Sequence, residues 1–168
     1  MAENSAIDIA DVAEADRDWL LALNQACLPA VSSLDMAALD ALLAEAAVAR
    51  VARIGETPAG ALIAFRPGTS YGSDNYRWFC DRFDDFLYVD RVMVSATARG
   101  SGLGATLYDD LADIATRLAV PRVTCEVNEE PPNPGSMRFH ERRGFRKIES
   151  RASAGGSKRV AMLAWTIV

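Results

Sequence analysis

Residues 86–118 constrain the fold of this chain more than any other segment. Residues 86–94 are apolar on both faces apart from Asp90 and Arg91, which is typical of a strand at the centre of a sheet. Leucine and isoleucine then recur every three or four residues between positions 103 and 118, which predicts a helix with one apolar face. Three glycines separate the two patterns: Gly100, Gly102 and Gly104. A glycine-rich turn between a buried strand and a helix commonly lets main-chain N–H groups approach a phosphate.

The rest of the chain alternates strand and helix patterns. Strand patterns cover residues 7–12, 48–55, 59–67, 122–128, 145–151 and 158–168. Helix patterns cover residues 15–27 and residues 134–143, the latter between Asn133 as N-cap and Gly144 as terminator. A further helix is expected to start near residue 33, where Ser32 or Ser33 can cap it, because apolar residues recur at helical spacing at positions 39, 42, 43 and 46. This order predicts an α/β (α+β) fold, with a mixed central sheet of six or seven strands flanked by about four helices. Since no long linker interrupts the order, residues 1–168 are expected to form a single domain.

Residues 68–85 form an unusually long connection between two of these strands. The connection is rich in aromatic side chains, namely Tyr71, Tyr76, Trp78, Phe79 and Phe83. Long ordered connections in compact domains are often functional, which favours a role in shaping a substrate pocket. A short helix that covers an edge of the sheet is the alternative, and the sequence leaves both interpretations open.

The composition argues against several functional classes. A formal net charge of −5 is unlike that of a non-specific nucleic-acid binder, which normally carries a basic surplus. One histidine and three cysteines without paired spacing indicate neither a metal site nor a disulfide framework. The sequence shows no secretory leader and no apolar run of about 18 residues, so no membrane association is expected. Together these features predict a cytoplasmic protein with reduced thiols.

The glycine stretch is compatible with more than one phosphate ligand. A P-loop requires a Lys–Ser/Thr pair after its last glycine, and Gly104 is followed by alanine and threonine instead. A dinucleotide-binding fold fits better, because residues 100–105 match G-x-G-x-x-A and Glu126 lies near the end of the next strand pattern, about where a ribose-binding carboxylate belongs. That fold, however, leaves no place for the two N-terminal helix patterns. It is retained as a minor alternative.

The third interpretation accounts for the whole chain. Residues 99–104, RGSGLG, match R/Q-x-x-G-x-G/A, and residues 139–145, FHERRGF, resemble F-[YH]-x-x-x-G-F. Both motifs are typical of the GNAT superfamily of acyl-CoA-dependent N-acyltransferases, and the order of strands and helices resembles that family as well. The resemblance implies acetyl-CoA as co-substrate, no metal, and a GNAT-type fold whose central strand splays away from its neighbour.

Within that resemblance, the main chain of residues 99–104 holds the CoA pyrophosphate and the central strand pairs with the pantetheine arm. The residues implied in acetyl-CoA binding are Val92, Met93, Val94, Arg99, Gly100, Ser101, Gly102, Leu103, Gly104, Ala105, Asn128, Asn133, Ser136 and Arg143. Asn133 has a second interpretation as the helix N-cap, and Arg143 has one as a solvated cation at a helix end. Both interpretations stay open at this stage.

The resemblance also implies that the amine attacks the thioester directly in a ternary complex. The main-chain N–H of Val94 would then stabilise the oxyanion. His140 occupies the place where many relatives carry a tyrosine that protonates the leaving thiolate; Tyr88 and Tyr108 are alternatives for that acid. Asp90 is the expected general base, because a carboxylate on an apolar strand must be paired, solvated or used. A structural ion pair with a nearby arginine is the alternative for Asp90.

The sequence says least about the acyl acceptor. We expect a small amine or amino acid, bound near the first two helices and near the aromatic side chains Tyr71, Tyr76, Trp78 and Phe79. The function predicted from the sequence is therefore that of an N-acetyltransferase (EC 2.3.1.-). A non-catalytic acyl-CoA sensor with the same fold is the rival, and a homodimer is compatible with the family.

Overall fold

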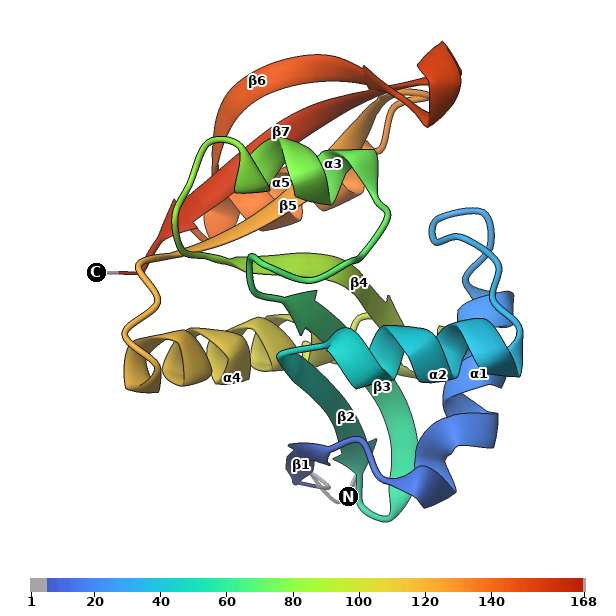
Figure 1. The fold of residues 1–168 in the computed structure, drawn as a ribbon. Coiled ribbons are helices and arrows are strands. Elements are labelled where there is room, and N and C mark those ends of the chain that lie inside the picture. The colour runs from blue at the N-terminus through green and yellow to red at the C-terminus, as the bar shows by residue number, and fades with distance from the viewer. Residues whose placement is uncertain (1–5, 168) are drawn as a thin grey trace. The chain divides into compact units, whose positions relative to one another are not determined.

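The computed structural model describes residues 6–167 (Figure 1). It divides into two compact units, each of which is described by itself. The first unit contains the chain up to Phe65 together with Asp90–Asp113, and the second contains Arg66–Val89 and the chain from Ile114 onward. The prediction of a single domain over the whole chain stays a prediction.

The first unit is built on antiparallel strands. It contains β1 (Ile7–Asp11), α1 (Arg17–Ala26), α2 (Met36–Glu45), β2 (Val48–Ile54), β3 (Thr57–Phe65), the end of β4 (Leu87–Val94) and the start of α4 (Leu103–Arg117). Strand β2 pairs with both β1 and β3 in antiparallel register. The core of this first unit is formed by fully buried aliphatic side chains, among them Leu20, Leu39, Val51, Leu62 and Leu107.

Helix α2 begins two or three residues later than the serine caps predict. Its N-cap is Asp35, whose side chain accepts a hydrogen bond from the main-chain N–H of Ala38 at 2.8 Å. The preceding residues are engaged by α1 instead, because Gln25 bonds to the Ser33 hydroxyl and to the main-chain N–H of Leu34. Tertiary contacts therefore moved the helix start.

The second unit contains α3 (Asp74–Cys80), the start of β4, β5 (Arg122–Glu130), α5 (Pro134–Arg142), β6 (Arg146–Ser153) and β7 (Lys158–Thr166). Strand β5 is parallel to β4 at Leu87 and Tyr88 and antiparallel to β7, which in turn pairs with β6. Hydrogen bonding orders the strands β1-β2-β3-β4-β5-β7-β6. The seven-stranded mixed sheet confirms the predicted fold class, and residues 6–167 contain five α-helices, one more than the four expected.

The additional helix, α3, lies in the long aromatic connection. Asn75 donates to the Ser153 hydroxyl at 3.2 Å and accepts from Arg151 at 2.9 Å. These bonds tie α3 to β6, the last strand in the sheet order. Of the two interpretations of residues 68–85, the structure contains the short helix at the sheet edge.

Both ends of α5 follow the predicted local chemistry. The Asn133 side chain accepts from the main-chain N–H of Ser136 at 3.2 Å, as an N-cap does. At the other end, Gly144 has a φ of 102°, and the N–H of Phe145 donates to the carbonyl of His140 at 3.1 Å. This is the Schellman closure that the glycine predicts.

None of the helices in residues 6–167 combines the length and the apolar character that a membrane crossing requires.

Candidate active site

The loop before α4 has the backbone that its glycines predict. Gly100 and Gly102 have φ angles of 79° and 82°, in the left-handed region that side-chain-bearing residues rarely adopt. A Cβ atom added at either position would meet no atom within 4 Å. Packing therefore does not require glycine here. The left-handed backbone conformation is what favours glycine at both positions, and the space beside the main chain stays open to a ligand.

Helix α4 gives this loop its electrostatic character. Its first residue, Leu103, is almost fully buried, so the helix start is firmly anchored. The first N–H groups of a helix have no intrahelical acceptor, and the helix dipole makes that end partly positive. Ser101 donates to the Ala98 carbonyl through both its N–H and its hydroxyl, which holds the loop in shape. The arrangement suits an anion such as a pyrophosphate.

A glycine on β3 packs closely against the start of α4, and its role was not predicted from the sequence. A Cβ atom at Gly60 would lie 2.7 Å from Cδ2 of Leu103 and 3.0 Å from the carbonyl oxygen of Met93. Gly60 thus lets the start of α4 and the end of β4 approach β3 closely. A glycine inside an apolar strand pattern was the available signal, because such glycines often mark close backbone approach.

The end of β4 carries the residues expected to pair with pantetheine. Met93 is buried, whereas Val92 and Val94 are half-buried on the opposite face of the strand. The strand is anchored just beyond its end, where the N–H of Ser95 donates to the Ala59 carbonyl at 2.8 Å. The splay of β4 and the oxyanion role of the Val94 N–H stay predictions.

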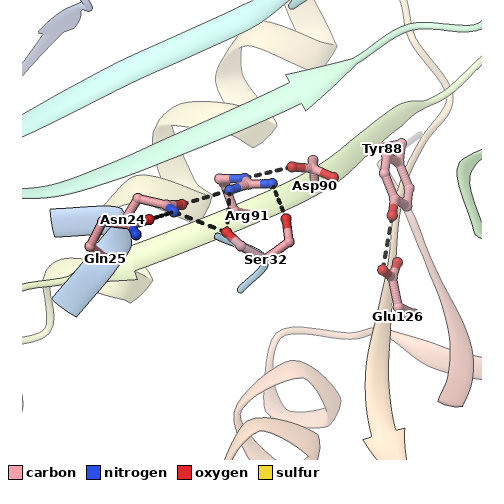
Figure 2. Close-up of polar contacts among 7 residues, drawn as sticks. All are labelled: Asn24, Gln25, Ser32, Tyr88, Asp90, Arg91 and Glu126. Carbon is pink, nitrogen blue, oxygen red and sulfur yellow. Dashed lines mark hydrogen bonds and ion pairs between the residues drawn. The ribbon is translucent and has the colours of Figure 1, made fainter. Parts of the chain in front are cut away.

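Asp90 forms the ion pair that was the alternative to its role as a base. Its Oδ2 accepts from Nε of Arg91 at 2.7 Å, and the two side chains are only 6% and 3% exposed (Figure 2). The Arg91 guanidinium also bonds to Asn24 and Ser32. Asp90 therefore has a structural function as counter-ion, and its role as general base stays a prediction.

A second polar pair lies on β4 and β5. The hydroxyl of Tyr88 donates to Oε1 of Glu126 at 2.9 Å (Figure 2). Tyr88 is fully buried, and the rings of Tyr76 and Phe79 lie 5.6 and 5.8 Å from its ring. A carboxylate held in such surroundings can accept a proton in a reaction. The pairing of Tyr88 with Glu126 was not predicted from the sequence. A charged residue inside the apolar strand pattern of β5 was the available signal.

Thr124 lies on the same face of β5 as Glu126, two residues earlier. It is fully buried, and its Oγ1 has no hydrogen-bond partner within residues 6–167. Replacing Thr124 with valine keeps the shape and removes the unsatisfied hydroxyl, so the free energy of unfolding should rise by about 1 kcal/mol in urea titrations. Thr69→Val is the control and should destabilise, because Oγ1 of Thr69 donates to Tyr76. A loss of stability in Thr124→Val would contradict this expectation.

His140 is buried in α5, and its ring is held by its own helix. Nδ1 lies 2.7 Å from the carbonyl oxygen of Ser136, which can only accept, so Nδ1 carries a hydrogen. The rings of Phe139 and Phe145 pack edge-on against it at 5.3 and 5.1 Å. Burial lowers the pKa of His140, Arg143 lowers it further, and the bond to Ser136 opposes both. The neutral ring is favoured, and the role of His140 as thiolate acid stays a prediction.

The lowered pKa of His140 makes stability depend on pH. On acidification the histidine protonates first in the unfolded chain, whose pKa is about 6.5, and only later in the folded protein. The free energy of unfolding should therefore fall as the pH drops below that value. The free energy of unfolding of the wild type is measured in urea near neutral pH and at a pH about two units lower. The same two measurements on His140→Gln provide the comparison. Because the chain has one histidine, NMR can follow its ring directly. Equal pH slopes in the two proteins would refute this.

The sequence matches the acetyltransferase (GNAT) family over residues 16–145. The chain belongs to the GNAT acetyltransferase family. None of the curated proteins matches this acetyltransferase.

Several solved structures share the fold at low sequence identity. Ard1 from Thermoplasma volcanium is 15% identical, with a TM-score of 0.77 over 97% of this chain and 99% of its own. Arabidopsis thaliana NAA60 in complex with acetyl-CoA is 16% identical, with a TM-score of 0.75 over 96% and 99%. The ribosomal-protein-S18-alanine N-acetyltransferase from Escherichia coli is 14% identical, with a TM-score of 0.74 over 96% and 94%. At these identities the likeness establishes the fold.

The remaining predicted acetyl-CoA residues of this acetyltransferase lie around α5 and in the glycine loop. Asn128 and Asn133 line a cavity of about 360 Å³ together with Met137 and Arg159. Asn133 is the N-cap of α5, and the Arg143 guanidinium lies 5.5 Å from the Trp165 ring. The sites proposed for CoA at Arg99, Gly104, Ala105, Ser136 and these residues stay predictions.

The predicted acceptor-binding aromatics of the acetyltransferase are largely core residues. Tyr76, Trp78 and Phe79 are between 0% and 8% exposed, whereas Tyr71 is half-buried. The Tyr76 hydroxyl donates to the carbonyl of Arg66 at 2.7 Å and so helps to fix the connection. Packing accounts for these three buried side chains, and their contact with an acceptor stays a prediction.

Proposed function

We propose that this acetyltransferase transfers an acetyl group from acetyl-CoA to a primary amine by direct attack in a ternary complex. One observation carries the proposal. Gly100 and Gly102, just before the 15-residue helix α4, have left-handed backbone, and a Cβ atom at either position would meet no atom within 4 Å. Membership of the acetyltransferase family supports it. So does the likeness to NAA60, whose structure was solved with acetyl-CoA.

The proposed reaction requires three groups from the chain: a base that takes the amine proton, a donor that stabilises the oxyanion, and an acid that protonates the leaving thiolate. The amine nitrogen attacks the thioester carbonyl, the carbonyl oxygen becomes an oxyanion, and the carbon–sulfur bond then breaks. The Val94 N–H is proposed to stabilise the oxyanion. The amine proton passes to a carboxylate, and the departing thiolate takes a proton from an acid. The proposed acid is His140, which would have to act in its imidazolium form, and Tyr88 is the alternative.

Two carboxylates compete for the role of base. Protonating Asp90 would leave the buried Arg91 guanidinium without its counter-ion, which is costly. Glu126 lies on β5, and the Tyr88 hydroxyl, on β4, holds its carboxylate in place through a hydrogen bond of 2.9 Å. We therefore propose Glu126 as the base and keep Asp90 as the second candidate.

The proposed acceptor is a small amine or an amino acid. The amino terminus of a protein is a second candidate, because one structure of the same fold is named as the acetyltransferase of the alanine of ribosomal protein S18. We also propose a cytoplasmic location and retain a homodimer as the oligomeric state to be tested by sedimentation.

The function is tested by incubating the protein with acetyl-CoA and a panel of amino acids, amino-acid amides, diamines and short peptides. Release of free thiol is followed, and the products are identified by mass spectrometry. Amine-dependent thiol release is the expected result. Binding of acetyl-CoA without turnover on any amine would favour the rival, a non-catalytic acyl-CoA sensor.

A further inference from the structure

The end of β4 lies against β3, next to the main-chain N–H proposed to stabilise the oxyanion. The N–H of Ser95, just beyond the end of β4, donates to the carbonyl of Ala59 on β3 at 2.8 Å. Two residues earlier, the carbonyl oxygen of Met93 lies 3.0 Å from the place that a Cβ atom of Gly60 would occupy. Both main-chain groups therefore point to β3, as groups two positions apart on one strand do.

The orientation of the Met93 carbonyl fixes the direction of the Val94 N–H. The two groups belong to one peptide unit, which is planar and trans, so its C=O and its N–H point in opposite directions. Because the Met93 oxygen points to β3, the Val94 N–H points away from β3. A donor in a reactive site has to be held within about 10–20° of its productive direction. Whatever lies beside the Met93 oxygen therefore controls the proposed oxyanion donor.

Gly60 is the residue of β3 that lies beside this oxygen. The φ of Gly60 is not in the left-handed region, so close contacts, and not the backbone conformation, require glycine here. One of these contacts, at 2.7 Å, is with Cδ2 of Leu103, the end of a side chain that can change rotamer. The other is with the Met93 oxygen, which is backbone and would have to move by a few tenths of an ångström. Such a movement turns the whole peptide unit, including the Val94 N–H.

We propose that Gly60 is a positioning residue for acetyl transfer: its missing side chain lets the Met93 carbonyl lie against β3 and so directs the Val94 N–H to the thioester oxygen of acetyl-CoA. The inference rests on the proposed function and adds a residue that acts on the oxyanion donor without touching the substrate. Replacing Gly60 with alanine should weaken the hydrogen bond to the thioester oxygen more than it weakens the binding of CoA.

The test is the carbonyl stretching band of acetyl-CoA, isotopically labelled at its thioester carbonyl carbon and measured by difference infrared spectroscopy in the bound complex. A hydrogen bond from the Val94 N–H weakens the C=O bond, so the band in the wild type should lie at a lower frequency than in free acetyl-CoA. In Gly60→Ala the band should move back towards the free value. The kcat with the best amine should fall about five- to tenfold, since a misplacement of about 1 Å costs about a hundredfold.

A second substitution separates the two contacts of Gly60. Leu103→Val removes Cδ2, so the double variant Gly60→Ala/Leu103→Val conserves the buried volume and is expected to fold. Compared with Leu103→Val alone, the double variant should bind CoA equally well in calorimetry. Its infrared band and its kcat should still be displaced, because the contact with the Met93 oxygen remains. If Gly60→Ala alone does not fold, this pair provides the same comparison.

Ala64→Val is the matched control for a loss of stability. Ala64 lies on the same face of β3, four residues beyond Gly60, and is fully buried. The added methyl groups should lower the melting temperature, leave the band in place and keep kcat within about twofold of the wild type.

Three results would overturn the inference: a wild-type band at the frequency of free acetyl-CoA, a band and a kcat that stay unchanged when Gly60 becomes alanine, or an equal displacement of both in Ala64→Val. Failure of the proposed function differs from all three, because the wild type would then bind no acetyl-CoA or release no thiol with any amine.

Discussion

Replacing Glu126 with glutamine should lower kcat by about two to three orders of magnitude at neutral pH, the contribution typical of a general base. Glutamine has nearly the same shape and can still accept the hydrogen bond from Tyr88, so the fold and the affinity for acetyl-CoA should be preserved. The basic group would be missing, and the acidic limb of the pH profile of kcat/KM should flatten. Steady-state kinetics with the best amine of the panel, combined with calorimetry with acetyl-CoA, measures both effects.

Three further variants test whether the loss of activity is specific to the Glu126 carboxylate. Glu149→Gln removes an exposed carboxylate that pairs with Arg82, and it should leave kcat within about twofold. Asp90→Asn tests the rival base, and a loss of kcat confined to that variant would transfer the role to Asp90. In Tyr88→Phe the Glu126 carboxylate loses its donor, so a smaller fall in kcat is expected. Full activity of Glu126→Gln with an unchanged pH profile would exclude Glu126 from the mechanism.

Replacing Gly102 with valine should raise the dissociation constant for CoA by about two orders of magnitude in calorimetry. At a φ of 82° a β-branched residue is strained by about 1–3 kcal/mol. Its side chain would also occupy the open space beside the first N–H groups of α4, where the pyrophosphate is proposed to bind. The strained backbone and the added side chain therefore both oppose the binding of CoA. If the backbone relaxed to relieve the strain, the N–H groups would turn away from the proposed pyrophosphate site.

Gly55 provides a matched control for this substitution. It also has a left-handed backbone, with a φ of 62°, and a Cβ there would likewise meet nothing within 4 Å. It lies in the turn between β2 and β3, so Gly55→Val should produce similar strain without blocking the loop before α4. Unchanged CoA affinity in Gly102→Val, or an equal loss in Gly55→Val, would refute the proposed pyrophosphate site.

Local patterns predicted much of the fold correctly. The central strand, the glycine loop and helix α4 follow from apolar periodicity and from glycine conformation within a single window of 33 residues, positions 86–118. The cap at Asn133 and the Schellman closure at Gly144 are likewise interactions between residues at most five positions apart. The predicted start of α2 was wrong, because its serines were taken up by tertiary contacts with α1 and Arg91.

The pairs that make up the candidate site were not predictable in this way. Tyr88 and Glu126 are 38 positions apart, and Arg91 and Asn24 are 67 apart. The chain contains 18 basic and 23 acidic residues, and a pattern along the sequence does not say which of them meet. For Asp90 the sequence left a base and an ion pair as equal alternatives, and only the structure identified Arg91 as its partner.

Dihedral preferences and contacts between residues one or two turns apart specify the order of strands and helices, the left-handed turns before α4 and both ends of α5, so these features could be predicted from the sequence. Tertiary structure decided which polar groups are buried together: Tyr88 with Glu126, and Arg91 with Asp90, Asn24 and Ser32. The physical reason is that burial makes an unpaired polar group costly, so each buried donor or acceptor takes the partner that the packed strands and helices bring within about 3 Å.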